Sequence, residues 1–84
     1  TILSVYPNPF NDQARVRFDL LKSERVEITL YDLTGRRVRT LADEVCDAGR
    51  HEIGFDARGL ASGTYFVRLR NHSIVRTQKI LLLR

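Results

Sequence analysis

The feature that most constrains this chain is an alternation of apolar and polar residues at a period of two, broken at short intervals by turn residues. Side chains alternate between the two faces of a β-strand, so this pattern predicts strands with one buried and one wet face. It recurs often enough to predict seven strands, at residues 2–6, 14–20, 25–30, 38–41, 52–56, 65–70 and 74–83, of which the fourth is the weakest. No stretch of ten residues carries the 3.6-residue period of a helix, so we expect no substantial helix.

Turn residues separate the predicted strands. Pro7 and Pro9 end the first strand, because a proline cannot donate a hydrogen bond to a sheet. The segment 32–35 predicts a type I turn, with Asp at its first position and Gly at its last. Residues 43–49 predict a longer loop, and residues 71–73 a tight final turn. Seven short antiparallel strands in 84 residues predict one all-β domain over residues 1–84, an immunoglobulin-like sandwich.

The parity of the apolar positions predicts the core between the two sheets. Its members are Val16, Phe18, Val26, Ile28, Leu30, Ile53, Phe55, Tyr65, Val67 and Leu69. Tyr65 begins the sixth strand after a crossing loop, where sandwich folds place a tyrosine corner. We expect its hydroxyl to bond the backbone near Leu60 or Ala61. Gly59 and Gly63 supply the permissive backbone that such a loop requires.

Composition excludes several kinds of site. The longest unbroken apolar run, residues 80–83, is far shorter than the ~20 residues of a membrane-spanning helix, so we expect no membrane insertion. Cys46 is the only cysteine, which excludes an internal disulfide. The few Cys and His residues lack the spacing of a zinc site. A calcium site would need more oxygens than Asn8, Asn11, Asp12 and Asp56 supply, so turn hydrogen bonds explain them better, and we expect no metal or cofactor.

Catalysis would depend on Cys46, His51 and Asp56, the one set of residues with a nucleophile, a base and an orienting acid. His51 and Asp56 stand at opposite ends of a predicted strand, roughly 16 Å apart, which is beyond hydrogen-bond reach. We therefore expect no catalytic residues and no enzyme activity.

Binding of nucleic acid or sugar is also disfavoured. We place seven arginines on outward faces: Arg15, Arg17, Arg37, Arg39, Arg68, Arg70 and Arg76. A nucleic-acid surface would interleave them with aromatic side chains, and Phe66 is the only outward aromatic that the pattern predicts. Cross-strand pairs with Asp19, Glu27 and Glu52 explain the arginines better, so we expect no nucleic-acid partner. Sugar binding would likewise need several exposed aromatics.

Five motifs, taken in order, resemble the type A C-terminal sorting domain of the type IX secretion system. They are YPNPFN at residues 6–11, YDLTGRRV at 31–38, AGRHE at 48–52, FDARGLASGTYFVRL at 55–69 and KILLLR at 79–84. Together they cover nearly the whole chain. Asp12 and Leu21 stand where the family often has proline, and Arg84 where it often has lysine.

The resemblance implies that the domain is an address for a cargo protein. Its expected partners are the type IX translocon, a sortase-like protease that removes the domain, and a passenger domain N-terminal to it. The expected route runs through the periplasm to the cell surface or the medium. The chain opens at Thr1 and shows neither Met nor a signal peptide, so we expect it to be a fragment of a longer secreted protein.

The motifs also suggest roles for individual residues. The candidates for the sorting signal lie at the entry to the sixth strand and in the last strand: Gly63, Tyr65, Lys79, Leu81, Leu82, Leu83 and Arg84. The residues expected to shape the fold are Pro7, Asn8, Pro9, Phe10, Asp32, Gly35 and Gly49. Two alternatives stay open: a flagellar hook-capping type of structural module, which shares the opening motif, and an accessory carbohydrate-binding domain of a secreted glycoside hydrolase.

Overall fold

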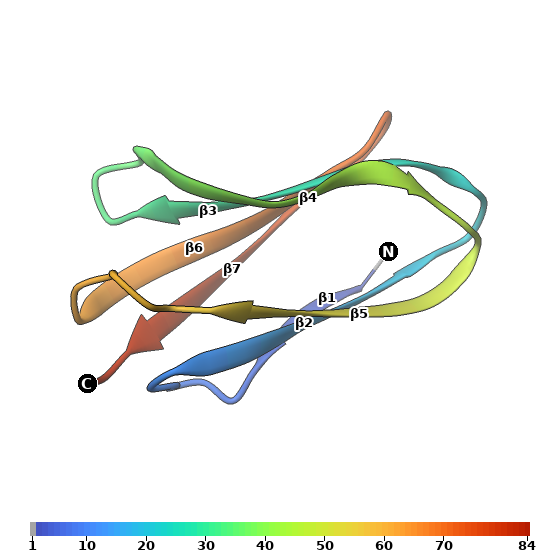
Figure 1. The fold of residues 1–84 in the computed structure, drawn as a ribbon. Coiled ribbons are helices and arrows are strands. Elements are labelled where there is room, and N and C mark those ends of the chain that lie inside the picture. Colours follow the sequence, from blue (N-terminus) through green and yellow to red (C-terminus); the bar gives the residue numbers. More distant parts are fainter. Residues whose placement is uncertain (1) are drawn as a thin grey trace.

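The structure, a computed structural model, describes residues 2–84 as two packed antiparallel sheets (Figure 1). Its seven strands are β1 (Leu3–Tyr6), β2 (Gln13–Leu20), β3 (Glu24–Asp32), β4 (Arg37–Cys46), β5 (Gly49–Asp56), β6 (Gly63–Arg70) and β7 (Val75–Leu82). One sheet has the order β1-β2-β5 and the other β4-β3-β6-β7. The predicted β-sandwich is therefore confirmed.

The core lies between the sheets and follows the predicted parity. Side chains that pair across β2 and β5, such as Val16 with Ile53 and Phe18 with His51, share the inner face. Of the ten predicted core residues, nine are buried, and Ile53 is half-buried because β5 is an edge strand. Phe10, Ile80 and Leu82 extend the core toward the end of the chain.

Strand β4 departs from the sequence-based prediction in two ways. It continues to Cys46, so the predicted loop over residues 43–49 is wrong, and only Asp47 and Ala48 connect β4 to β5. Two register shifts against β3 also place neighbouring residues, Val38 with Arg39 and Leu41 with Ala42, together on the half-buried side. A β-bulge inserts one extra residue into a strand. The bulges explain why Val38 and Leu41 are three residues apart rather than two or four.

The short connections follow local turn chemistry. Gly35 donates its backbone N–H to the carbonyl of Asp32 over 3.0 Å and has a φ of 86°, so the predicted turn at residues 32–35 is confirmed. Oδ1 of Asp32 accepts bonds from Thr34 Oγ1 at 2.6 Å, Thr34 N and Arg36 N. These bonds, that of the Thr34 hydroxyl first, lower the pKa of Asp32. At the other end of the molecule, Asn71 closes the predicted β6–β7 turn by accepting from Ile74 N at 2.8 Å.

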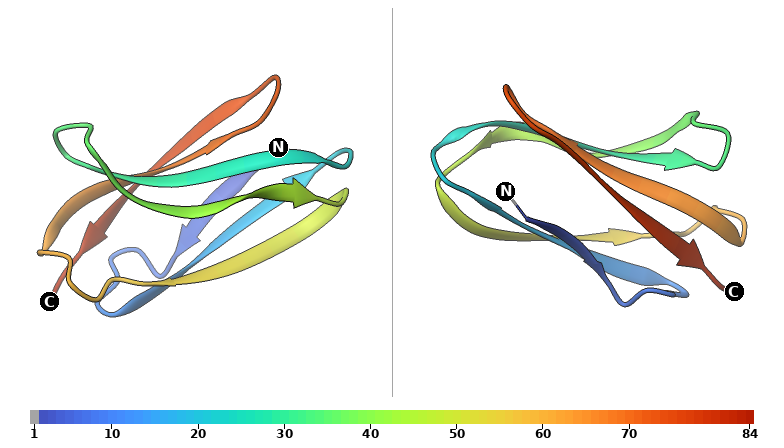
Figure 2. Two further views of the ribbon diagram at one scale, coloured as in Figure 1. Left: turned by 45° about the horizontal axis from the view of Figure 1, so that its top comes forward. Right: turned by 180° about the vertical axis from the view of Figure 1, so that it is seen from behind.

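Different connections between strands lie at the two ends of the sandwich. The β3–β4 turn, the β5–β6 loop and the segment between β1 and β2 lie at the same end of the sandwich as the C-terminus (Figure 1). The tip of the β6–β7 hairpin lies at the opposite end, as both views of Figure 2 show. Within residues 2–84 no helix has the length and apolar character needed to cross a membrane.

Candidate functional site

The predicted sorting residues meet at one corner of the four-stranded sheet, where β6 begins and β7 ends. Antiparallel pairing sets Gly63 opposite Leu82, and Tyr65 opposite Ile80. The motif entering β6 and the apolar run closing the chain therefore lie side by side, although residues 66–79 separate them in sequence. The burial of their side chains divides these residues into two groups.

The first group is structural. Leu82 is fully buried between the sheets. Tyr65 is also buried, and its hydroxyl donates a 2.6 Å hydrogen bond to the carbonyl of Ala61. The predicted tyrosine corner is thereby confirmed. Gly63 has a φ of 151°, in the range that favours glycine, at the point where the loop turns into β6.

The second group faces outward. Lys79, Leu81 and Leu83 occupy alternate positions of the last strand and its extension, and all three are exposed. Lys79 pairs across the sheet with Phe66, which is half-buried on the same outer face. The exposed set therefore combines one cation with apolar side chains, a composition that suits contact with another protein better than contact with water.

The segment between β1 and β2 covers the outer edge of β7 at this corner. Asn8 imitates a neighbouring strand with its side chain: its Nδ2 donates to the carbonyl of Lys79, and its Oδ1 accepts from Leu81 N, each over 3.1 Å. Phe10 continues the ladder with its backbone, donating to the Leu81 carbonyl at 3.0 Å and accepting from Leu83 N at 2.8 Å. The flanking prolines Pro7 and Pro9 lack an N–H, so an asparagine amide supplies the missing partner.

Phe10 also anchors this segment in the core. Its side chain is 3% exposed and packs edge to face on Phe55 of β5, with 5.6 Å between ring centroids. The opening motif thus joins the two sheets, because it contacts β5 through a side chain and β7 through its backbone.

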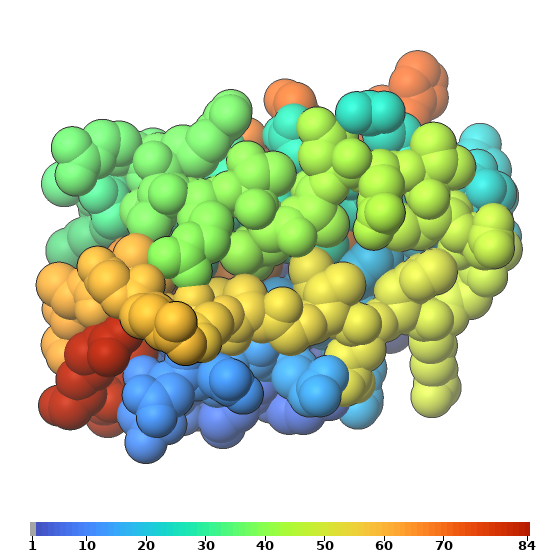
Figure 3. Space-filling view, in the orientation of Figure 1, coloured from blue at the N-terminus to red at the C-terminus, as the bar shows by residue number. Residues whose placement is uncertain are grey.

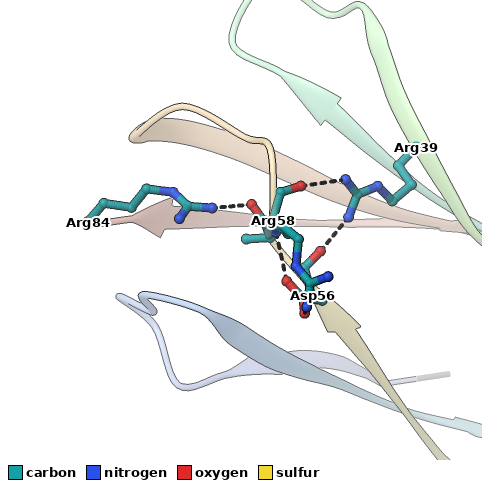
Figure 4. A network of polar contacts seen from close by, with 5 residues as sticks. Arg39, Asp56, Arg58 and Arg84 are labelled. Atoms are coloured by element: carbon teal, nitrogen blue, oxygen red, sulfur yellow. Dashed lines mark hydrogen bonds and ion pairs between the residues drawn. The ribbon is translucent and has the colours of Figure 1, made fainter.

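Two arginines hold the β5–β6 loop from opposite sides (Figure 4). The guanidinium of Arg84 donates to the carbonyls of Ala57 and, over 2.8 Å, Leu60. That of Arg39, on β4, donates to the carbonyls of Asp56 and, over 3.1 Å, Arg58. In Figure 3 the red C-terminal residues lie directly against the orange loop.

These contacts correct one prediction and refine another. Arg39 does not point outward: the bulge at Val38 turns it toward the other sheet, where it bridges β4 to the end of β5. Arg84 is exposed, yet its guanidinium is engaged with the loop and is not a free surface charge. Of the two predicted basic signal residues, only Lys79 has its charged group free for a partner within residues 2–84.

The outer faces of both sheets carry arginine–aromatic pairs. Arg17 lies over the ring of Tyr6 at 5.1 Å, and Arg68 lies over Tyr31 at 4.6 Å. The prediction that Phe66 is the only outward aromatic is wrong, because Tyr6 and Tyr31 also face outward. Each ring is covered by a guanidinium and so does not offer the open stacking platform that a sugar-binding face requires.

Predicted ion pairs across the strands are confirmed at two of the three acidic residues. Glu52 pairs with Arg15 at 3.1 Å and with Arg17 at 3.5 Å, and Glu27 pairs with Arg70 at 3.1 Å. A 2.6 Å bond from the Tyr6 hydroxyl, followed by these arginines, lowers the pKa of Glu52. Asp19 instead accepts a bond from the backbone of Ile2.

The three residues considered for catalysis have separate local roles. His51 stacks on Phe18 and places its Nε2 2.6 Å from the carbonyl of Asp47. Asp56 accepts from Arg58 N at 2.7 Å. Cys46 ends β4 and is half-buried, and burial raises the pKa of its thiol. Within residues 2–84 no group of three His, Cys, Asp or Glu side chains could hold a metal ion.

Three contacts at this corner went unpredicted: the strand-like amide of Asn8, the Arg39 bridge and the Arg84 bond to the loop. Only the first had a signal in the sequence. The prolines on both sides of this asparagine lack an N–H, and its side-chain amide offers an additional donor and acceptor. The other two contacts join distant parts of the chain and leave no local pattern.

The comparisons with known proteins agree with this geometry. No curated protein matches the chain significantly. The profile of one protein family, described as the secretion system C-terminal sorting domain, matches residues 4–83. This match supports the sorting domain over the structural-module and sugar-binding alternatives. It covers nearly the whole chain, and the chain belongs to the Por secretion system C-terminal sorting domain family, a non-catalytic family of secretion signals for cargo proteins.

Proposed function

We propose that this domain directs a passenger, fused N-terminal to it, across the outer membrane through the type IX translocon. A sortase-like protease then removes the domain, and the passenger reaches the cell surface or the medium. Membership of the sorting-domain family over residues 4–83 is the observation that carries this proposal. The surface that we propose for recognition is the exposed set Lys79, Leu81 and Leu83 on the last strand.

The arrangement of that strand supports this choice. Leu81 and Leu83 are exposed to 36% and 51%, so both side chains present apolar surface beside Lys79. The clamp formed by Asn8 and Phe10 holds their backbone in place, so the side chains are presented in one geometry. A pre-organised surface loses less conformational entropy when a partner binds.

The test is export of a passenger that carries a signal peptide and ends in this domain, in a host with the type IX system. We expect the passenger in the medium or on the cell surface, and a passenger without the domain should stay in the periplasm. Retention of the intact, folded fusion in the periplasm would contradict the proposal.

Variants of the two basic residues then test the surface itself. Lys79→Gln removes a charge that no described residue uses, so it should leave folding intact and slow export. Arg84→Gln also removes the bonds to the loop, so the melting temperature of each fusion must be compared with its export rate. Normal export of the Lys79→Gln fusion would exclude that charge from the signal.

A further inference from the structure

The outer edge of β7 has two halves that differ in their hydrogen bonding. Backbone groups of successive strand residues point alternately to the two sides of the strand. On the side away from β6, the backbone N–H and C=O of Leu81 and the N–H of Leu83 bond to Asn8 and Phe10. By the same alternation Val75, Thr77 and Lys79 also direct their N–H and C=O groups outward.

The half of this edge nearer the hairpin tip is open. β7 pairs with β6 alone among the strands. Within residues 2–84 nothing bonds either backbone group of Thr77, nor the amide N–H of Val75 or Lys79. The cover provided by Asn8 ends at the carbonyl of Lys79. Two carbonyls of this stretch accept bonds from side chains, that of Val75 from Arg76 and that of Lys79 also from Gln78. Within residues 2–84 the open edge, Val75 to Lys79, therefore presents the unpaired N–H groups of Val75, Thr77 and Lys79 and the unpaired carbonyl of Thr77, which is a template for adding another strand.

The hairpin that carries this edge projects from the molecule. In Figure 3 its orange tip stands above the neighbouring strands. Arg76 lies on the same strand face as Ile80 and Leu82, yet it is exposed because the core does not extend beneath it. The end of β7 nearer the hairpin tip, from Val75 to Thr77, is therefore exposed on both faces of the strand.

Charge is distributed unevenly along the chain. All ten acidic residues lie within residues 1–56, whereas residues 57–84 contain six basic and no acidic side chains. The net charge of +4 is thus the balance of −2 in the first segment and +6 in the second. Arg70 pairs with Glu27, and Arg68 is stacked on Tyr31. Within residues 2–84, Arg76 and Lys79 have no acidic partner, and both belong to the open edge.

We propose that the open edge from Val75 to Lys79 pairs with an extended, acidic segment of a protein partner, which adds a strand to the four-stranded sheet. This inference rests on the proposed function and extends its recognition surface from Lys79 along β7 toward the hairpin tip. Unpaired N–H and C=O groups both require partners, and another polypeptide backbone supplies both, whereas a polyanionic sugar lacks the regular donors. Arg76 and Lys79 lie on opposite faces of β7, so acidic residues on both faces of an added strand can reach them.

Proline scanning of the edge in the passenger fusion tests the backbone pairing. Thr77→Pro removes an N–H that faces solvent, a position where edge strands tolerate proline. We expect export to fall about tenfold or more, because the docked strand loses a hydrogen bond and meets the proline ring. Thr77→Val keeps the N–H and should be exported about tenfold faster than Thr77→Pro. Equal export of the two variants would overturn the proposal.

Charge reversal tests the chemistry of the partner. Arg76→Glu combined with Lys79→Glu should slow export, whereas Lys22→Glu, an exposed charge change in the β2–β3 connection, should not. If charge reversal blocks export but Thr77→Pro does not, the partner is a polyanion that contacts the side chains of β7. The proposal that it pairs with the backbone as an added strand is then wrong. If the unaltered fusion is not exported, the proposed function fails before this inference is reached.

A binding measurement on the unaltered fusion tests the same pairing without a substitution, so its result does not depend on whether Thr77→Pro folds. The probe is a synthetic nine-residue peptide that alternates Glu with Val, and its matched control replaces every Glu with Lys. Hydrogen exchange of the Thr77 and Lys79 amides should slow with the acidic peptide and not with the basic one. Slowing by neither peptide, or slowing by heparin to the same extent, would overturn the inference.

Discussion

The outer edge of β7 has two halves that follow one another along the strand, and they differ in their cover. Other residues cover only the half nearer the C-terminus. Toward the C-terminus, Asn8 and Phe10 satisfy the outward backbone groups and pack a phenyl ring into the core. Toward the hairpin tip, no backbone group within residues 2–84 pairs with the outward N–H groups of Val75, Thr77 and Lys79, and the side chains of these three residues are exposed. The clamp is made by uncharged groups of Asn8 and Phe10, whereas the open edge carries the basic side chains of Arg76 and Lys79.

The difference teaches how a small sandwich can combine stability with recognition. Long edge strands with free backbone groups invite aggregation, and natural proteins shorten or cover them. Here the cover leaves about one half of β7 accessible, which limits the length of any strand that can dock. We infer that stability is concentrated at the clamped end and that the open end can change with little effect on folding.

The largest difference in stability between the two ends is expected when Phe10, which anchors the clamp in the core, is truncated. Phe10→Ala deletes a side chain that is 3% exposed and packs on Phe55. We expect a loss of about 3–5 kcal/mol of unfolding free energy, the usual effect of truncating a buried phenylalanine. Urea unfolding measures it. The matched change at the open end, Val75→Ala, should stay within about 0.5 kcal/mol, and equal losses at both sites would contradict the contrast.

A smaller effect is expected from the strand-like amide of Asn8. Asn8→Ala removes both bonds to β7, so we expect a loss of about 1–2 kcal/mol. His72→Ala, at the exposed hairpin tip, serves as the control and should leave stability unchanged. Hydrogen exchange gives a residue-specific measurement, because the Leu81 amide should lose protection while the core amides keep theirs. Unchanged protection of Leu81 would show that Asn8 does not cover the strand.

The tyrosine corner tests the neighbouring strand at the same end. Tyr65→Phe keeps the buried ring and removes the bond to the Ala61 carbonyl, which should cost on the order of 1 kcal/mol. The measurement is the melting temperature of the variant against that of the parent protein. A variant that melts together with the parent would argue against a stabilising role of the hydroxyl.

The smallest effect concerns the surface cluster around Glu52, which we compare with the clamp. Hydrogen bonding from Tyr6, together with the nearby arginines, lowers the pKa of Glu52 in the folded protein. The stabilisation is therefore present above the unfolded pKa and is lost as the pH falls through the folded pKa. Glu52→Gln should reduce stability slightly at neutral pH and have less effect in acid. Parallel curves of unfolding free energy against pH would contradict this.

Most of the fold could be predicted because it depends on local alternation. In β2 every second residue from Ala14 to Leu20 is buried, and this pattern alone identifies both the strand and its inner face. The full length of strand β4 could not be predicted from alternation. It is an edge strand whose two bulges shift the parity, and its exposed end at residues 43–45 carries no apolar alternation.

The candidate site shows the same division more sharply. Tyr65 and the apolar final strand were predictable because a turn motif and a hydrophobic run mark them in the sequence. The cover of Asn8 on β7 joins residues more than seventy positions apart, and the bond of Arg84 to Leu60 joins residues 24 apart. Hydrogen bonds of this kind depend on which ends of the strands meet when the two sheets pack. Periodicity specifies which face of a strand is buried, and only the assembled sandwich decides which part of its edge remains open.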